Sequence, residues 1–263
     1  MEYLPYEVLR LKIWFLPLIL QKHTLNNRKC LRFLPNKNSS LLLKLSCNIH
    51  TLLQKLIAAP SFSKEEYATA SILFDYLQHN GVTPNRHLNN VWATNKHFDP
   101  TKPTILLNSH HDTVKPNAGY TIDPYDPIIQ EGKLYGLGSN DAGGALVSLI
   151  AVFTYLYNKK EINYNLSILA SAEEESSGYN GIGSVIPLIP EIDFAIIGEP
   201  TLMKMAIAER GLIVFDLKVK GTASHAAHKN YDNPIIKSID VLNWINNLKF
   251  EKKSNFLGSV KVT

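Results

Sequence analysis

Apolar and polar residues follow one another along most of the chain in a pattern that predicts short buried strands separated by helices. Three continuous apolar runs predict strands, at residues 103–108, 166–170 and 194–197. Runs of this length without polar alternation are typical of strands buried on both faces, as in parallel sheets. Because helical segments lie between them, we expect an α/β fold, a mostly parallel sheet with helices on both faces.

The helices are predicted by apolar residues that recur at every third or fourth position. This spacing occurs at 42–56 and 142–157. Pro60 closes the first of these helices. Ser63 and Glu66 have the spacing of a capping box, which predicts the start of another helix that ends at Asn80-Gly81.

The pattern changes after residue 207. From Ile213 to Val219 apolar residues alternate with polar ones, which predicts a strand with one face in water. A helix is predicted from about Pro234 to Leu248, and Gly258 begins a further strand. These changes divide the chain into three parts. The parts are a basic extension at 1–40, a large α/β domain at 41–207, and the start of a smaller α+β domain at 208–263.

The net charge of +4 is unevenly distributed between the extension and the rest of the chain. Residues 1–45 hold eight Lys/Arg and two Glu, a balance of +6, and the other residues hold 19 basic and 21 acidic side chains, a balance of −2. The body therefore has no cationic field suited to nucleic acid. The extension is either unstructured, or wrongly assigned to the protein, or a targeting peptide.

Membrane and disulfide classes are also excluded. The apolar run at 13–20 is too short to span a bilayer. Two cysteines, Cys30 and Cys47, cannot form a disulfide framework. With 45% hydrophobic and 19% charged residues, the composition is that of an ordinary globular protein. We expect a protein of a reducing compartment, the cytoplasm.

Chemistry-bearing residues follow the predicted strands. His110 and Asp112 lie just after the first strand, and residues i and i+2 of an extended segment point the same way. Asp112 could therefore hydrogen-bond to the imidazole of His110, which orients the ring and makes it a more basic metal ligand. The alternative is a chance pairing, since the chain has nine histidines.

Five acids complete the set. Asp141 lies within the glycine-rich segment 136–144 just before a helix, where it could bridge two cations or simply cap the helix. Glu173, Glu174 and Glu175 follow the second strand, and Glu199 follows the third. A run of acids is usually a solvated face and a lone Glu a loop acid. Meeting at one sheet edge, however, these acids and one imidazole suit zinc or another first-row divalent ion, and their number suits two ions.

In this order the motifs resemble the acetylornithine deacetylase and succinyl-diaminopimelate desuccinylase family of co-catalytic zinc amidohydrolases. The resemblance covers residues 41 to 263 and rests on four segments: Ser109-His-His-Asp-Thr-Val114, Gly138-Ser-Asn-Asp-Ala-Gly-Gly144, Ala172-Glu-Glu-Glu175 and Gly198-Glu-Pro-Thr201. It implies a zinc-peptidase-like catalytic domain at 41–207 and a lid or dimerisation domain that begins at 208.

The resemblance also implies roles for individual residues. His110 and Glu199 would bind the first zinc, Glu175 the second, and Asp141 would bridge the two. Asp112 would orient His110, and Glu174 would be the general base. His225, in Lys220-Gly-Thr-Ala-Ser-His225, would reach the site of a partner subunit and steady the tetrahedral oxyanion. Co²⁺ would be a substitute metal, and Glu173 receives no role.

The implied reaction is hydrolysis of the amide bond of a small N-acyl amino acid by a homodimer. The segment Ser109 to Pro116 favours N-acetylornithine, in arginine biosynthesis; succinyl-diaminopimelate and a dipeptide are the alternatives. The family's last ligand of the second zinc, a histidine, has no match in this chain. We therefore expect a C-terminally truncated member, either part of an active enzyme or an inactive product that only binds metal.

Overall fold

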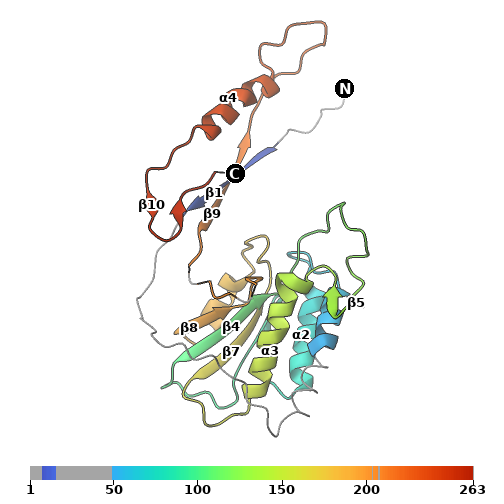
Figure 1. Cartoon of the computed structure of the whole chain (residues 1–263), viewed down its shortest axis with the longest axis vertical. Helices are drawn as coiled ribbons and strands as arrows, with labels where there is room; N and C mark the ends of the chain where they lie inside the picture. Colours follow the sequence, from blue (N-terminus) through green and yellow to red (C-terminus); the bar gives the residue numbers. More distant parts are fainter. Residues whose placement is uncertain (1–7, 16–48, 203, 207, 263) are drawn as a thin grey trace. The chain divides into compact units, whose positions relative to one another are not determined.

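The computed structural model describes residues 8–15, 49–202, 204–206 and 208–262 (Figure 1). Two compact units make up the chain: Leu31–Met203, and Met1–Cys30 together with Lys204–Thr263. This division falls at residue 203, and the sequence predicted it at 207. The first predicted helix is present at 49–57, and its expected beginning at 42–48 lies outside the described residues.

A five-stranded sheet forms the centre of the larger unit, in the order β2-β3-β7-β4-β8. The strands are β2 (Asn85–His87), β3 (Asn90–Thr94), β4 (Thr104–His110), β7 (Asn165–Ser171) and β8 (Phe194–Ile197). The three strands predicted from the apolar runs, β4, β7 and β8, are mutually parallel. The unpredicted strands β2 and β3 form an antiparallel hairpin that extends the sheet beside β7. The mostly parallel α/β sheet predicted from the sequence is thus confirmed.

Helices pack against one face of this sheet and build the main core. They are the helix at 49–57, α2 (Tyr67–His79) and α3 (Gly144–Leu156), of which α2 and α3 are drawn side by side in Figure 1. The consecutive residues Ile168 and Leu169 of β7 point to opposite faces of the sheet, and Ile168 packs with the helices. On the other face, Leu169 packs with Val185, between the short turns η2 (Ile182–Ser184) and η3 (Ile186–Leu188).

Two positions on α3 test how far this core determines stability. Ile150 is fully buried and Val152 is 49% exposed. Replacing Ile150 by alanine leaves a cavity beneath the sheet, and we expect the free energy of unfolding to fall by about 2–5 kcal/mol. Val152→Ala on the same helix should cost less than about 1 kcal/mol, because its side chain stays largely in water. Urea unfolding of both variants measures the difference, and equal losses would contradict the assigned core.

The smaller unit contains β1 (Val8–Phe15) paired antiparallel with β9 (Gly211–Lys218). The sequence predicted the strand at 213–219 but no structure for 8–15. It also contains α4 (Pro234–Asn246), whose N-cap Asn233 accepts hydrogen bonds from the amides of Ile235 and Ile236. The strand predicted from Gly258 onward is limited to β11 (Gly258–Ser259), which pairs with β10 (Lys253–Ser254).

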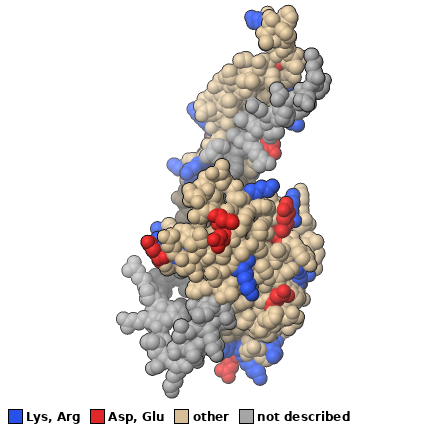
Figure 2. All heavy atoms as spheres, turned by 90° about the vertical axis from the view of Figure 1, so that its right-hand side faces the viewer, with Lys and Arg blue, Asp and Glu red and all other residues tan. Residues whose placement is uncertain are grey.

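Two properties of the described residues concern the nucleic-acid-binding and membrane-spanning classes that the sequence analysis excluded. On the face drawn in Figure 2, acidic and basic side chains are interspersed, and the described residues form no continuous basic surface there. Among the described residues, no helix has both the length and the apolar character that a bilayer crossing requires.

Candidate metal centre

Parallel strands bring the predicted site residues to one edge of the sheet. β4 ends at His110, which lies opposite Ser171 at the end of β7, and Asn108 lies opposite Ile197 at the end of β8. Glu173–Glu175 and Glu199 therefore follow strands that end beside His110. The Ser109 hydroxyl donates to the Gly198 carbonyl at 2.8 Å, which ties the loop that carries Glu199 to β4.

Asp141 reaches the same edge from the turn before α3. This turn, η1 (Ser139–Gly143), follows Gly138, whose φ of 77° lies in the left-handed region that favours glycine. The glycine-rich segment thus forms a sharp turn that presents Asp141 beside β4. A strand pair β5 (Ile128–Gln130) and β6 (Lys133–Tyr135) precedes it.

Three of the four predicted ligands offer donor atoms that lie close together. His110, Asp141 and Glu175 each place one ligand atom within 4.8 Å of the others. His110 Nε2 lies 3.1 Å from Asp141 Oδ1 and 3.9 Å from an oxygen of the fourth, Glu199. Glu174 also has an oxygen 3.9 Å from this nitrogen. The structure therefore brings an imidazole and four carboxylates together.

The electrostatics of this cluster favour a cation. Burial lowers the pKa of His110, but Asp112, Glu174 and Glu199 raise it more, and the result is about 10. Burial and the neighbouring carboxylates raise the pKa of Glu199 to about 7, although the charge of His110 opposes this shift. The pKa of Glu175 is raised by burial and then by Asp141. Clustered carboxylates repel one another, and a divalent ion would convert this repulsion into binding.

The donor set fits zinc. One imidazole nitrogen and several carboxylate oxygens are ligands that Zn²⁺ accepts, and Co²⁺ takes similar sites. The Nδ1 atom of His110 donates to the backbone carbonyl of Asp112 at 3.0 Å, so Nε2 is the nitrogen left for a metal. Nε2 is also the atom that faces Asp141, Glu174 and Glu199.

Asp112 holds the site differently from what the sequence predicted. Its carboxylate is 3.5 Å from His110 Nδ1, farther than its own carbonyl, although it still contributes to the raised pKa of the histidine. The same carboxylate accepts hydrogen bonds from the Ser63 hydroxyl and from the amides of Glu174 and Glu175, at 2.7–3.1 Å. Burial alone would raise the pKa of Asp112, but the contact with His110 and then these three hydrogen bonds lower it. Asp112 therefore orients both the histidine and the acidic segment.

The capping box predicted from Ser63 and Glu66 does not form. Glu66 is the N-cap residue of α2 and makes no side-chain capping bond. Ser63 instead donates to Asp112, and the Glu66 carboxylate accepts from the amide of Glu173 at 3.1 Å. Both side chains thus contact the site. The capping-box prediction was misleading because the spacing of Ser63 and Glu66 does not show whether their side chains bond to the helix or to distant residues.

His111, next to the predicted ligand, faces the interior instead. Its Nδ1 lies 2.9 Å from the Thr69 hydroxyl, and its Nε2 lies 2.9 Å from the Asn89 carbonyl. Burial lowers the pKa of His111 to about 4. His111 is therefore a neutral packing residue, and adjacent histidines have different environments.

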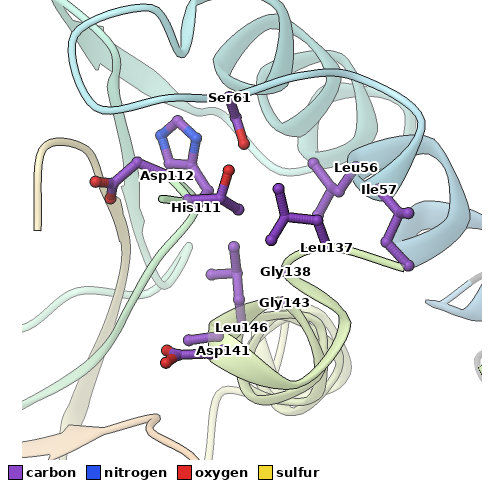
Figure 3. A pocket seen from close by; sticks show the side chains of 12 residues that line it. Leu56, Ile57, Ser61, His111, Asp112, Leu137, Gly138, Asp141, Gly143 and Leu146 are labelled. Atoms are coloured by element: carbon purple, nitrogen blue, oxygen red, sulfur yellow. The ribbon is translucent and has the colours of Figure 1, made fainter. Parts of the chain in front are cut away.

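A small hollow, open to solvent, lies beside Asp141 and Asp112. The apolar side chains of Leu56, Ile57 and Leu146 line part of it. Figure 3 shows Asp141 beside α3 at one edge of this hollow and Asp112 at another. The hollow thus adjoins the candidate metal centre at one predicted ligand, Asp141.

His225 belongs to the other unit, at Lys204–Thr263. Its side chain is exposed, and its Nδ1 accepts a hydrogen bond from the amide of Ala227 at 3.2 Å. Its ring centroid lies 5.7 Å from that of His228. The role predicted for His225 stays a prediction.

Comparison with known proteins supplies a family match. The model of peptidase family M20/M25/M40 matches residues 106–249. A succinyl-diaminopimelate desuccinylase of Rickettsia bellii is 30% identical over 227 residues, which is 78% of this chain and 57% of that protein. The Buchnera aphidicola protein of the same name is 33% identical over 228 residues, or 80% of this chain and 59% of that one.

Solved structures resemble the chain more distantly. The M20 family metallo-carboxypeptidase of Sulfolobus solfataricus is 25% identical with a TM-score of 0.47, covering 59% of this chain and 37% of that one. The chain spans somewhat less than 60% of the length of the two curated relatives described above.

Proposed function

Because the chain belongs to peptidase family M20/M25/M40, we propose that it takes part in metal-dependent hydrolysis of the amide bond of an N-acyl amino acid. The observation that carries the proposal is the group of His110, Asp141 and Glu175, whose ligand atoms lie within 4.8 Å of one another at the end of a parallel sheet. Sites in open α/β sheets form at this end of the strands. We assign residues 41–207 as the metal-binding catalytic domain and 208–263 as the start of a lid or dimerisation domain.

The chain's residues would divide the work around two Zn²⁺ ions. His110, Asp141 and Glu199 would hold one ion, and Asp141 and Glu175 would contribute to the other. Zn²⁺ bound here would polarise the amide carbonyl and make water more acidic. Nδ1 of His110 is fixed by Asp112, which keeps the imidazole oriented.

Glu174 is the proposed proton acceptor. Its side chain is 53% exposed, so it is accessible to water and substrate, yet one of its oxygens lies 3.9 Å from His110 Nε2. A carboxylate in this place can take a proton from the attacking water and pass it to the leaving amine. Asp112 fixes the Glu174 backbone amide at 3.0 Å. We further propose that His225 stabilises the oxyanion from a partner subunit of a homodimer.

For the substrate we propose an N-succinyl amino acid of the succinyl-diaminopimelate type. Its support is the name shared by the two curated relatives, each about 30% identical. The motif-based interpretation favoured N-acetylornithine, so that substrate is the competitor to test. A dipeptide, the other alternative of the motif-based interpretation, is the third candidate.

A substrate panel tests this proposal. The protein is freed of metal with a chelator, reloaded with Zn²⁺ or Co²⁺, and assayed for amine release from N-succinyl-diaminopimelate, N-acetylornithine and a dipeptide. We expect no release without metal and the highest kcat/KM for the succinyl substrate with metal. A preference for N-acetylornithine would contradict the substrate assignment. Metal binding without turnover of any of the three would contradict the hydrolase proposal and favour a chain that only binds metal.

A further inference from the structure

We propose that Glu66 is a positioning residue that fixes the backbone of the segment carrying Glu174 and Glu175. The inference rests on the proposed function in that these two acids are taken as proton acceptor and metal ligand. The inference adds Glu66 to the residues that build the site, although Glu66 lies 107 positions before Glu173 in the sequence. Glu66 itself offers no atom to the metal group of His110, Asp141 and Glu175.

Three successive backbone amides are held by carboxylate oxygens. The Glu173 amide donates to Glu66 Oε1 at 3.1 Å, the Glu174 amide to Asp112 Oδ1 at 3.0 Å, and the Glu175 amide to Asp112 Oδ2 at 3.1 Å. Successive amides that point into one concavity are a preferred site for anions. Here the buried carboxylates of Glu66 and Asp112 accept from the three amides, and the Asp112 carboxylate also lies 3.5 Å from His110 Nδ1. Of these two carboxylates, that of Glu66 has no other assigned function.

The Glu66 carboxylate has little freedom to move. It is fully buried, and besides the Glu173 amide it accepts from the Lys64 amide at 2.6 Å and from the Asn89 side-chain nitrogen at 2.9 Å. The Asn89 amide is oriented in turn, because its Oδ1 accepts from Arg86 at 3.3 Å. A buried carboxylate with three donors is a rigid support, and its removal would leave buried donors unpaired.

The segment it holds turns sharply after β7, so a small shift there would move both acids. Glu173 has φ of 55°, in the left-handed region, where a non-glycine residue requires support from its surroundings. Its side chain turns inward, with Oε1 accepting from the Asn180 side chain at 3.0 Å, and it is 4% exposed. Glu174 and Glu175 are exposed on the site side. Fixing the Glu173 amide therefore sets which acids face the metal centre.

Three variants and one control separate positioning from general stability. Glu66→Ala removes the acceptor. Glu66→Gln keeps one oxygen for the Lys64 and Glu173 amides. Glu66→Asp is shorter by one methylene and reaches them poorly. Asn95→Ala is the matched control. The buried Asn95 side chain accepts a hydrogen bond from the Leu166 amide at 2.9 Å, at the opposite end of β7.

Metal binding and amide exchange are measured without substrate. In calorimetric Zn²⁺ titrations, we expect Glu66→Ala to weaken binding at the site that uses Glu175 by about 10- to 100-fold, the range typical of residues that support ligands. The visible absorption of the Co²⁺ form should change with it. Glu66→Gln should restore both, and Asn95→Ala should change neither. In metal-free protein, hydrogen exchange of residues 172–176 should accelerate in Glu66→Ala but not in Asn95→Ala.

The outcomes distinguish this inference from the proposed function. Unchanged exchange, Zn²⁺ affinity and Co²⁺ spectrum in Glu66→Ala would overturn the positioning role, whatever the enzyme hydrolyses. If Glu66→Ala does not fold, Glu66→Asp decides: weaker binding supports the role, and wild-type binding overturns it. Altered exchange and metal binding in a protein that hydrolyses none of the tested substrates would support Glu66 while contradicting the hydrolase proposal.

Discussion

Replacing His110 by alanine will abolish tight Zn²⁺ binding. The expected loss exceeds the roughly 10- to 100-fold typical of residues outside the ligand set, because His110 contributes the nitrogen donor of the described cluster. Without it, Asp141, Glu175 and Glu199 would remain as a group of carboxylates that repel one another. Calorimetric titration of metal-free protein with Zn²⁺ measures the effect.

His111→Ala is the matched control for this experiment. His111 is the adjacent histidine and is also buried, but its two nitrogens contact Thr69 and Asn89 rather than the carboxylate cluster. We expect this variant to lose stability and to keep its Zn²⁺ affinity. Retained binding in His110→Ala, or equal loss in both variants, would contradict the assignment of His110 Nε2 to the metal.

Replacing Glu174 by glutamine will slow turnover strongly while leaving metal binding in place. Glutamine has nearly the same shape but cannot accept the proton, and general base catalysis contributes about 10²- to 10⁴-fold. We expect kcat to fall by that factor, with KM and Zn²⁺ affinity changed little. Steady-state kinetics on the best substrate of the panel, together with a Zn²⁺ titration, provide the test.

The control is Glu161→Gln, which makes the same chemical change at an exposed acid outside the cluster. Its kcat should equal that of the unaltered protein. A Glu174→Gln variant with undiminished kcat would show that another group accepts the proton. A variant that loses Zn²⁺ as well would instead make Glu174 a ligand.

The central strands could be predicted because their burial is a property of local sequence. In β7 every residue from Asn165 to Ser171 is buried, and the predicted run covers 166–170. The predicted and observed limits of β8 are the same, 194–197. The hairpin β2–β3 was missed because Asn85–Thr94 is rich in polar residues and its longest apolar run, Val91-Trp92-Ala93, is only three residues long. β1 was missed although Leu9, Leu11 and Ile13 alternate with Arg10 and Lys12, because this segment was interpreted as part of a basic extension.

The sequence predicted which residues form the site better than it predicted the contacts between them. Strand ends gave His110, Glu175 and Glu199 a common edge, and alternation along an extended segment put His110 and Asp112 on the same side. The sequence did not reveal that the Asp112 carboxylate holds the amides of Glu174 and Glu175. It assigned Ser63 and Glu66 to a helix cap, and tertiary contacts recruited both to the site instead. Local rules often fail at functional sites for this reason.

Zinc-edge anomalous scattering from crystals of the zinc-loaded protein tests the metal centre most directly. We predict anomalous density at the carboxyl end of β4, about 2.0–2.2 Å from His110 Nε2 and from carboxylate oxygens of Asp141 and Glu199, with a second peak adjoining Glu175. Zinc bound elsewhere in fully loaded crystals, with His110 and Asp141 making no metal contact, would contradict the metal centre and the hydrolase function proposed from it.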